Sequence, residues 1–257
     1  MKHLMISGLR LEYRDLPATR EGRPTLLLLH EGLGSVTMWR RFPEQLAATT
    51  GCRLIVWSRA GYGGSEPYGE PRTPHYMHHE AEAALPALLA GLGIERPVLI
   101  GHSDGGTIAL LFAAAFPEVP LGVAVLAPHE FIEEETLAGI RSARVAWSTT
   151  DWPQKLARHH ADAARVFRDW SETWLSQELR QWNIVDRLAT IRCPVLAIQG
   201  VADEYATLRQ IEVIAEQVPG ARMLALPGCG HAPHQEQEAI VLAALTEFIE
   251  PLEPPLS

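Results

Sequence analysis

Cysteine is rare in this sequence. The three cysteines, Cys52, Cys193 and Cys229, are odd in number, lie far apart and form no C-x-x-C pair. That pattern argues against a framework of structural disulfides and against a zinc knuckle. Cys229 stands just before His231, but no neighbouring residue indicates a nucleophile, so we interpret it as a packing residue.

Long apolar runs and an excess of basic residues are also missing. No run reaches the roughly 20 residues that a membrane-spanning helix needs, and residues 1–7 lack the continuous apolar stretch of a secretory signal. A cytoplasmic protein with no membrane partner is therefore expected. The 22 basic residues against 31 acidic ones, a formal net charge of −9, argue against a nucleic-acid-binding surface and favour solubility.

The length and composition are typical of one globular domain. Hydrophobic residues make up 47% of the 257 residues and charged residues 21%, enough for one sizeable core with a small insertion. Glycine and proline occur as single breaks between apolar segments rather than as tracts. Only the tail 251–257 is expected to be disordered.

Short apolar segments alternate with longer helical ones along most of the chain. Strands are predicted as a short pair within residues 4–14, and at 24–30, 53–57, 98–100, 121–126, 195–199 and 221–226. Helices are predicted at 38–49, 75–92 and 107–116. Two more are predicted, one that follows residue 205 and ends at 218, and a closing one that ends at residue 250. This alternation predicts an α/β fold with a doubly wound, mostly parallel sheet.

One segment interrupts the alternation. Residues 129–190 show no strand pattern and are predicted to form several tryptophan-containing helices. We interpret the segment as a helical cap inserted between two parts of the core, residues 1–128 and 191–257. Most of its tryptophans are expected to serve packing, with Trp147 and Trp174 as candidates for lining an apolar substrate pocket.

A G-x-S-x-G motif lies between a predicted strand and a predicted helix, in the sequence Gly101-His102-Ser103-Asp104-Gly105. A serine on such a turn has a strained backbone, and the glycines on either side leave room for it. The free N–H groups at the start of the following helix favour negative charge beside the serine. Ser103 is therefore the candidate nucleophile.

A serine hydroxyl needs a general base, and that base needs a carboxylate to orient it. Among eleven histidines, His231 is selected because it lies in a glycine-bounded loop after the last predicted strand. Asp203 also follows a predicted strand, and the order Ser103, Asp203, His231 is that of a nucleophile-elbow enzyme. Glu130 and Glu204 stay open as alternative acids.

Two backbone N–H groups are expected to form an oxyanion hole, that of Asp104 and that of Gly32 or Glu31 in the first glycine-rich loop. The carboxylate of Glu31 would oppose negative charge there, so we expect it to point outward or to pair with a base such as Arg59. No metal is predicted, because His79-Glu80 lacks the second histidine of an H-E-x-x-H motif. No cofactor is predicted either, because a serine nucleophile with its base and acid requires none.

These motifs together resemble the α/β-hydrolase fold superfamily, in its capped, serine esterase-like or lipase-like form. The resemblance rests on the elbow at 101–105, His30-Glu31-Gly32, Gly61-Tyr62-Gly63-Gly64-Ser65, Asp203 and Gly230-His231. It implies an eight-stranded, mostly parallel sheet with a helical cap after the sixth strand. The chain departs from many relatives at Glu31, where they have glycine, and at Ser58, where they have aspartate.

The function predicted from these residues is hydrolysis of small-molecule carboxylic esters through an acyl-enzyme on Ser103, without a cofactor. A meta-cleavage-type C–C hydrolase, a lactonase and a thioesterase would use the same residues and stay open. A serine at the elbow disfavours halide displacement, since the similar dehalogenases have aspartate there. A ligand receptor with little turnover is the alternative from another class. Neither the acyl and alcohol groups nor the oligomeric state are indicated by the sequence.

Overall fold

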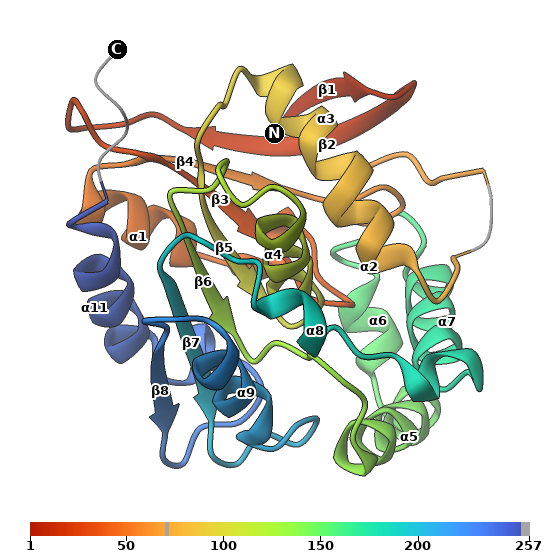
Figure 1. The fold of residues 1–257 in the computed structure, drawn as a ribbon. Helices are drawn as coiled ribbons and strands as arrows, with labels where there is room; N and C mark the ends of the chain where they lie inside the picture. The colour runs from red at the N-terminus through yellow and green to blue at the C-terminus, as the bar shows by residue number, and fades with distance from the viewer. Residues whose placement is uncertain (70–71, 253–257) are drawn as a thin grey trace.

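An eight-stranded sheet forms the centre of the molecule (Figure 1). The structure, a computed structural model, describes residues 1–69 and 72–252, so residues 253–257 of the tail predicted to be disordered lie outside it. The strands are β1 (Lys2–Ile6), β2 (Leu9–Leu16), β3 (Thr25–Leu29), β4 (Arg53–Trp57), β5 (Val98–His102), β6 (Gly122–Leu126), β7 (Val195–Gly200) and β8 (Arg222–Leu226). Their order across the sheet is β1-β2-β4-β3-β5-β6-β7-β8.

The strand directions confirm the predicted doubly wound, mostly parallel sheet. Strands β3 to β8 pair in parallel with their neighbours, while β1 pairs with β2 and β2 with β4 in antiparallel fashion. Strands β1 and β2 are joined at Ser7 (φ 50°) and Gly8 (φ 82°), the two positive φ angles of a tight hairpin turn. The antiparallel edge therefore comes from a local hairpin, and the rest from βαβ crossovers.

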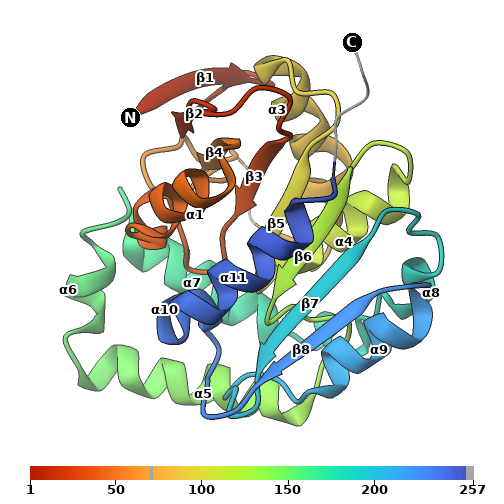
Figure 2. The same ribbon diagram turned by 90° about the vertical axis from the view of Figure 1, so that its left-hand side faces the viewer.

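Helices cover both faces of the sheet because each strand side chain alternates in direction. In β3, Leu26 and Leu28 pack in one apolar cluster with residues of α1 (Phe42–Thr50) and α11 (Glu238–Ile249), which lie on the same face (Figure 2). Leu27 and Leu29 pack in the opposite cluster. That second face is covered by α3 (Leu85–Leu92), α4 (Asp104–Ala115) and α9 (Arg209–Gln217).

Two predicted helices differ from the structure. The helix predicted at 38–49 is divided at Arg40, whose φ of 54° ends the short 3₁₀ helix η1 (Val36–Trp39) before α1 begins. The helix predicted at 75–92 consists of α2 (Tyr76–His79), the π-helical segment η2 (Glu80–Ala84) and α3. Pro86 has no N–H to donate to the preceding turn, which accounts for the altered hydrogen bonding there.

The segment between β6 and β7 is helical. It contains α5 (Glu134–Thr149), α6 (Trp152–Leu156), α7 (Ala163–Trp174), η3 (Glu178–Gln181) and α8 (Val185–Leu188). Helices α5, α6 and α7 lie beside one another (Figure 1), whereas α8 packs against α4 and α9 of the layer that covers the sheet. The assignment of residues 129–190 as a cap stays a prediction. Within the described residues, no helix is both long enough and apolar enough to cross a bilayer.

Candidate active site

Ser103 lies at the turn between β5 and α4, with φ 51° and ψ −119°. This left-handed conformation is unfavourable for a residue with a side chain, and such strain is concentrated at functional sites. A Cβ atom on Gly101 would collide with the carbonyl group of Gly105, and one on Gly105 would collide with that of Leu29. Both glycines of the motif are therefore required by the close backbone approach that raises Ser103.

Ser103, His231 and Asp203 form a chain of hydrogen bonds. His231 Nε2 lies 3.0 Å from Ser103 Oγ, and His231 Nδ1 lies 2.9 Å and 3.0 Å from the two carboxylate oxygens of Asp203. The side chain of Asp203 is fully buried and also accepts from the backbone N–H of Tyr205 at 2.8 Å. The three residues follow β5, β7 and β8, whose carboxyl ends meet at one edge of the sheet.

The pKa shifts of the base and the acid agree with this geometry. Burial by itself lowers the pKa of His231, but the hydrogen bond and the charge of Asp203 outweigh burial and raise it above the ordinary histidine value. Burial likewise raises the pKa of Asp203, and the contact with His231 outweighs it so that the pKa is lowered. Asp203 therefore favours the imidazolium form that His231 would adopt on taking a proton from Ser103.

The two alternative acids do not contact the imidazole ring. Glu130 is fully buried, and neither of its carboxylate oxygens has a hydrogen-bond partner among the described residues. Burial, with a smaller contribution from Glu133, raises the pKa of Glu130 well above its usual range. Glu204 instead accepts from the backbone N–H of His231 at 3.2 Å, so it supports the loop and leaves the ring to Asp203.

The residues predicted for the oxyanion hole lie around Ser103. Glu31, Gly32 and Asp104 line the same cavity as the serine. A Cβ atom on Gly32 would stand 2.5 Å from Cδ1 of Trp170, so glycine is needed for the loop to pass beneath that ring. Asp104 is the first residue of α4, and its N–H has no carbonyl partner in its own helix. Their role as oxyanion donors stays a prediction.

Glu31 does not lie as the sequence suggested. Its carboxylate oxygen Oε2 is 3.5 Å from Nδ1 of His102, and its side chain is only 19% exposed. Arg59 instead donates to the backbone carbonyl of Glu31 at 3.0 Å and faces the carboxylate of Asp104 at 3.5 Å. Arg59 is held by its own buried partners, so Glu31 pairs with another base, His102, rather than with Arg59 as suggested.

Glu31 also links the first loop to the loop of the base. His102 Nε2 donates to the backbone carbonyl of His231 at 2.7 Å, while its Nδ1 faces Glu31. Burial raises the pKa of Glu31, but the contacts with His102 and His30 outweigh burial and hold it well below its usual range. Glu31 is therefore charged near neutral pH, and it is one of the charges that raise the pKa of His231.

We expect Glu31→Gln to move the acidic limb of the kcat/KM profile to lower pH. Removing this negative charge removes one contribution to the raised pKa of His231, so the base is deprotonated at lower pH. The change in kcat at the plateau is expected to stay within about tenfold, since Asp203 still orients the ring. The measurement is a pH profile of both proteins, with the exposed Glu118→Gln as a matched control. An unmoved limb would contradict the assigned role of Glu31.

A cavity of about 160 Å³ opens beside Ser103. Its lining is mostly apolar and aromatic: Glu31, Gly32, Leu33, Met38, Ser103, Asp104, His129, Thr136, Ile140, Trp152, Leu156, Trp170, Trp174, Tyr205 and His231. Trp174 lines it, whereas Trp147 is not among the lining residues and stacks on Phe167, with ring centres 4.0 Å apart. Trp152 and Trp170 were not selected from the sequence, although the spacing of Trp170 and Trp174 on one helix predicts a shared face.

His129 and the side chain of Asp104 are further contributors that motif reasoning missed. The ring of His129 stacks near His231 with centres 5.7 Å apart, and burial and then the neighbouring His231 lower the pKa of His129 to about 3. Asp104 Oδ2 accepts from the hydroxyl of Tyr76 at 2.6 Å, and that hydroxyl accepts from Trp174 Nε1 at 3.0 Å. Asp104 Oδ1 is buried without a partner among the described residues.

The described part of the chain contains no group of three or more His, Cys, Asp or Glu residues that could hold a metal ion.

The chain belongs to the α/β hydrolase fold family, whose model matches residues 24–165, more than half of the sequence. It is therefore a hydrolase by family. A curated relative named serine hydrolase BPHL, from Mus musculus, is 27% identical, with 89% of this chain and 79% of the relative covered. A proline iminopeptidase from Lactobacillus helveticus is 22% identical, covering 93% of this chain and 94% of the relative.

The solved structures point to the same fold. The crystal structure of the enol-lactonase from Burkholderia xenovorans LB400 superposes with a TM-score of 0.75 at 20% identity, covering 97% of this chain and 100% of that one. At this identity the likeness concerns the fold, and the bond that this chain cleaves has to be argued from its own residues.

Proposed function

We propose that this protein is a serine hydrolase that cleaves carboxylic esters through an acyl-enzyme intermediate. The observation that carries the proposal is the hydrogen-bonded chain from Ser103 through His231 to Asp203, at 3.0 Å and 2.9 Å, on a strained strand-to-helix turn. His231 Nε2 takes the proton of Ser103 as the oxygen attacks the ester carbonyl, and then gives it to the leaving alcohol. Water, activated by the same imidazole, hydrolyses the acyl-enzyme and frees Ser103.

The tetrahedral intermediate carries its negative charge on the former carbonyl oxygen. We assign the backbone N–H groups of Asp104 and of Gly32 or Glu31 to that oxygen, because these residues lie beside Ser103. The free amide groups at the first turn of α4 add the favourable end of the helix dipole. The nearby Glu31 carboxylate opposes this charge, and it faces Nδ1 of His102 at 3.5 Å.

The charges of the cavity beside Ser103 support a second candidate function with a narrower range of substrates. Glu31 and Asp104 are both in its lining, and none of the described lysines or arginines is. Asp104 Oδ2 faces Arg59 at 3.5 Å and accepts from Tyr76, whereas Oδ1 has no partner among the described residues and is the oxygen that we assign to a positive group of the substrate. Esters or amides with an amino group near the scissile carbonyl fit this arrangement, and one curated relative is named proline iminopeptidase.

The first test is labelling with a fluorophosphonate, followed by peptide mass spectrometry, beside assays on p-nitrophenyl acetate and butyrate. Labelling of Ser103 with parallel loss of ester turnover supports the serine hydrolase. Turnover only of a vinylogous diketone, a lactone or a thioester would instead assign the same site to one of those bonds. Binding of a ligand, seen as thermal stabilisation, without labelling or turnover would favour the receptor.

We expect Asp104→Asn to discriminate between charged and neutral esters. The variant should lower kcat/KM for an amino-acid p-nitrophenyl ester by about 10- to 100-fold, the size expected for a charge pair at a few ångströms in a partly screened site. The neutral p-nitrophenyl ester of the same acyl length should change much less, because the backbone N–H of residue 104 is retained. Equal losses on both esters would exclude the cationic substrate and leave the general esterase.

A further inference from the structure

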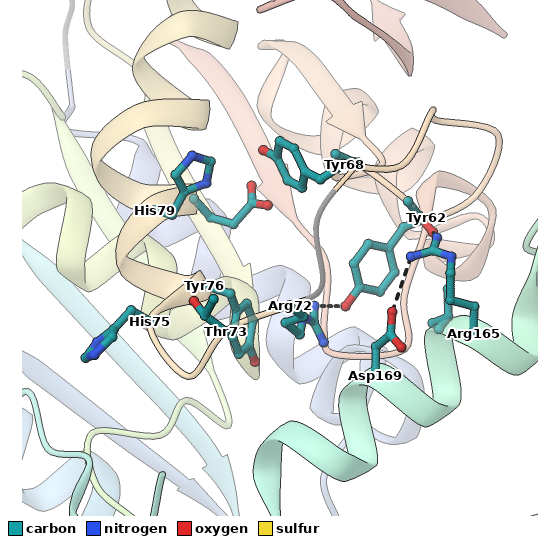
Figure 3. A pocket seen from close by; sticks show the side chains of 14 residues that line it. Tyr62, Tyr68, Arg72, Thr73, His75, Tyr76, His79, Arg165 and Asp169 are labelled. Carbon is teal, nitrogen blue, oxygen red and sulfur yellow. Dashed lines mark hydrogen bonds and ion pairs between the residues drawn. The ribbon is translucent and has the colours of Figure 1, made fainter. Parts of the chain in front are cut away.

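A second cavity, of about 360 Å³, lies outside the catalytic pocket (Figure 3). It is enclosed by the loop after β4, the start of α2 and η2, and the first turns of α7, with Tyr62, Tyr68, Arg72, Glu80 and Arg165 among its lining residues. It shares no lining residue with the cavity beside Ser103. Nothing in the proposed ester hydrolysis uses it.

Tyr76 separates the two cavities. Its ring lines the second cavity, while its hydroxyl is bonded to Asp104 and Trp174, both of which line the catalytic one. Helix α7 contributes to the same partition, because Arg165 and Val166 line the second cavity and Trp170 and Trp174 the first. A ligand in the second cavity would therefore be beside the catalytic site without filling it.

Arg72 brings a positive charge into the second cavity that has no ion-pair partner among the described residues. Its guanidinium carbon lies 3.9 Å from the ring centre of Tyr76, and the group donates to the hydroxyl of Tyr62, so that Arg72 is held between the two tyrosines (Figure 3). Its Nη1 is buried and has no hydrogen-bond partner among the described residues. Within residues 1–69 and 72–252, no carboxylate oxygen lies within 4.0 Å of the Arg72 guanidinium, so Arg72 forms no ion pair there.

Glu80 brings a buried carboxyl group into the same cavity, with no ion-pair partner among the described residues. The residue is 5% exposed, and its Oε2 is buried without a partner in the described ranges. Burial raises the pKa of Glu80 against the opposing charges of Arg59 and Arg72. Other charges nearby are matched, since Arg165 pairs with Asp169 at 3.4 Å and Arg59 faces Asp104 at 3.5 Å.

Two groups of opposite charge, the buried Glu80 and the partly buried Arg72, thus share one cavity without touching each other. A buried charge without a partner is unfavourable, and a ligand that satisfies only one of the two leaves the other unpaired. We infer that the second cavity binds a small zwitterion of the α-amino-acid type, with its carboxylate on Arg72 and its ammonium group on Glu80. The tyrosine rings of the lining leave an apolar wall for the side chain of such a ligand.

The test is calorimetric titration of the whole protein with L-alanine, L-leucine and L-phenylalanine. At least one is expected to bind, and its two singly charged analogues are then titrated: for L-leucine, 4-methylpentanoate and 3-methylbutylamine. Each analogue is expected to bind about tenfold or more weakly, because each leaves one buried charge without a partner. Absence of binding by all three amino acids, with only ordered water between Arg72 and Glu80 in a crystal soaked with them, would overturn the inference.

Substitutions of the charged residues in the second cavity test whether the amino acid binds there. Arg72→Gln and Glu80→Gln are each expected to weaken the amino acid by about tenfold or more, while the exposed Glu82→Gln in the same π-helical segment leaves it unchanged. Ser103→Ala should retain the affinity, because the serine lies in the other cavity. Circular dichroism checks that each variant folds. If Arg72→Gln does not fold, Arg72→Lys, which keeps the charge, is titrated in its place. Unchanged affinity in both cavity variants, or loss of amino-acid binding in Ser103→Ala, would refute the site.

Discussion

Ser103→Ala is expected to lower kcat for p-nitrophenyl butyrate by a factor of about 10⁵ to 10⁶, the loss typical of removing a triad nucleophile. No other hydroxyl in this site is within hydrogen-bond distance of His231 Nε2, as far as the described residues go. The fold should be retained, because alanine and serine both carry a Cβ atom at the φ of 51° and suffer the same backbone strain. The measurement is steady-state turnover of purified protein beside a thermal melt.

Two controls make the result on Ser103 specific. Ser148→Ala changes an exposed serine of α5, and it should leave turnover unchanged. The fluorophosphonate should label the parent protein and the Ser148 variant but not the Ser103 variant. Residual activity within tenfold of the parent in a well-folded Ser103→Ala protein would show that another group attacks the substrate.

Asp203→Asn is expected to lower kcat by about 10⁴ with the fold intact, the second large effect. Asparagine can present an N–H to His231 Nδ1, which selects the wrong tautomer and removes the negative charge that favours the imidazolium. The raised pKa of His231 arises mainly from Asp203 acting against burial, so without that charge the pKa falls. The acidic limb of kcat/KM, which requires neutral His231, should therefore move to lower pH, and further than in Glu31→Gln.

The alternative acids provide matched controls for Asp203. Glu130→Gln and Glu204→Gln are each expected to keep kcat within about tenfold, because neither carboxylate contacts the ring of His231. Glu130→Gln should also keep or raise the melting temperature, since it removes a buried carboxyl without a described partner. Near-normal activity in Asp203→Asn together with loss in Glu130→Gln would overturn the assignment of the acid.

Much of the site was predictable because it depends on local backbone geometry. The elbow around Ser103 needs glycine at two positions for close backbone contact, and that requirement is visible in the motif itself. Parallel strands bring their carboxyl ends to one edge, so residues that follow β5, β7 and β8 were expected to meet. For this reason the order of Ser103, Asp203 and His231 along the chain selected three residues that the fold brings within hydrogen-bond distance.

By itself the sequence determined the class of fold, the strands and the position of the strained serine, since apolar periodicity and glycine spacing record local conformation. Only the tertiary structure decided which charges are paired. Glu31 faces His102 rather than Arg59, and Arg72 and Glu80 share a cavity without touching, because such contacts depend on how distant elements pack. A side chain's partner in space has no fixed spacing along the chain, whereas a strand, a helix or a turn does.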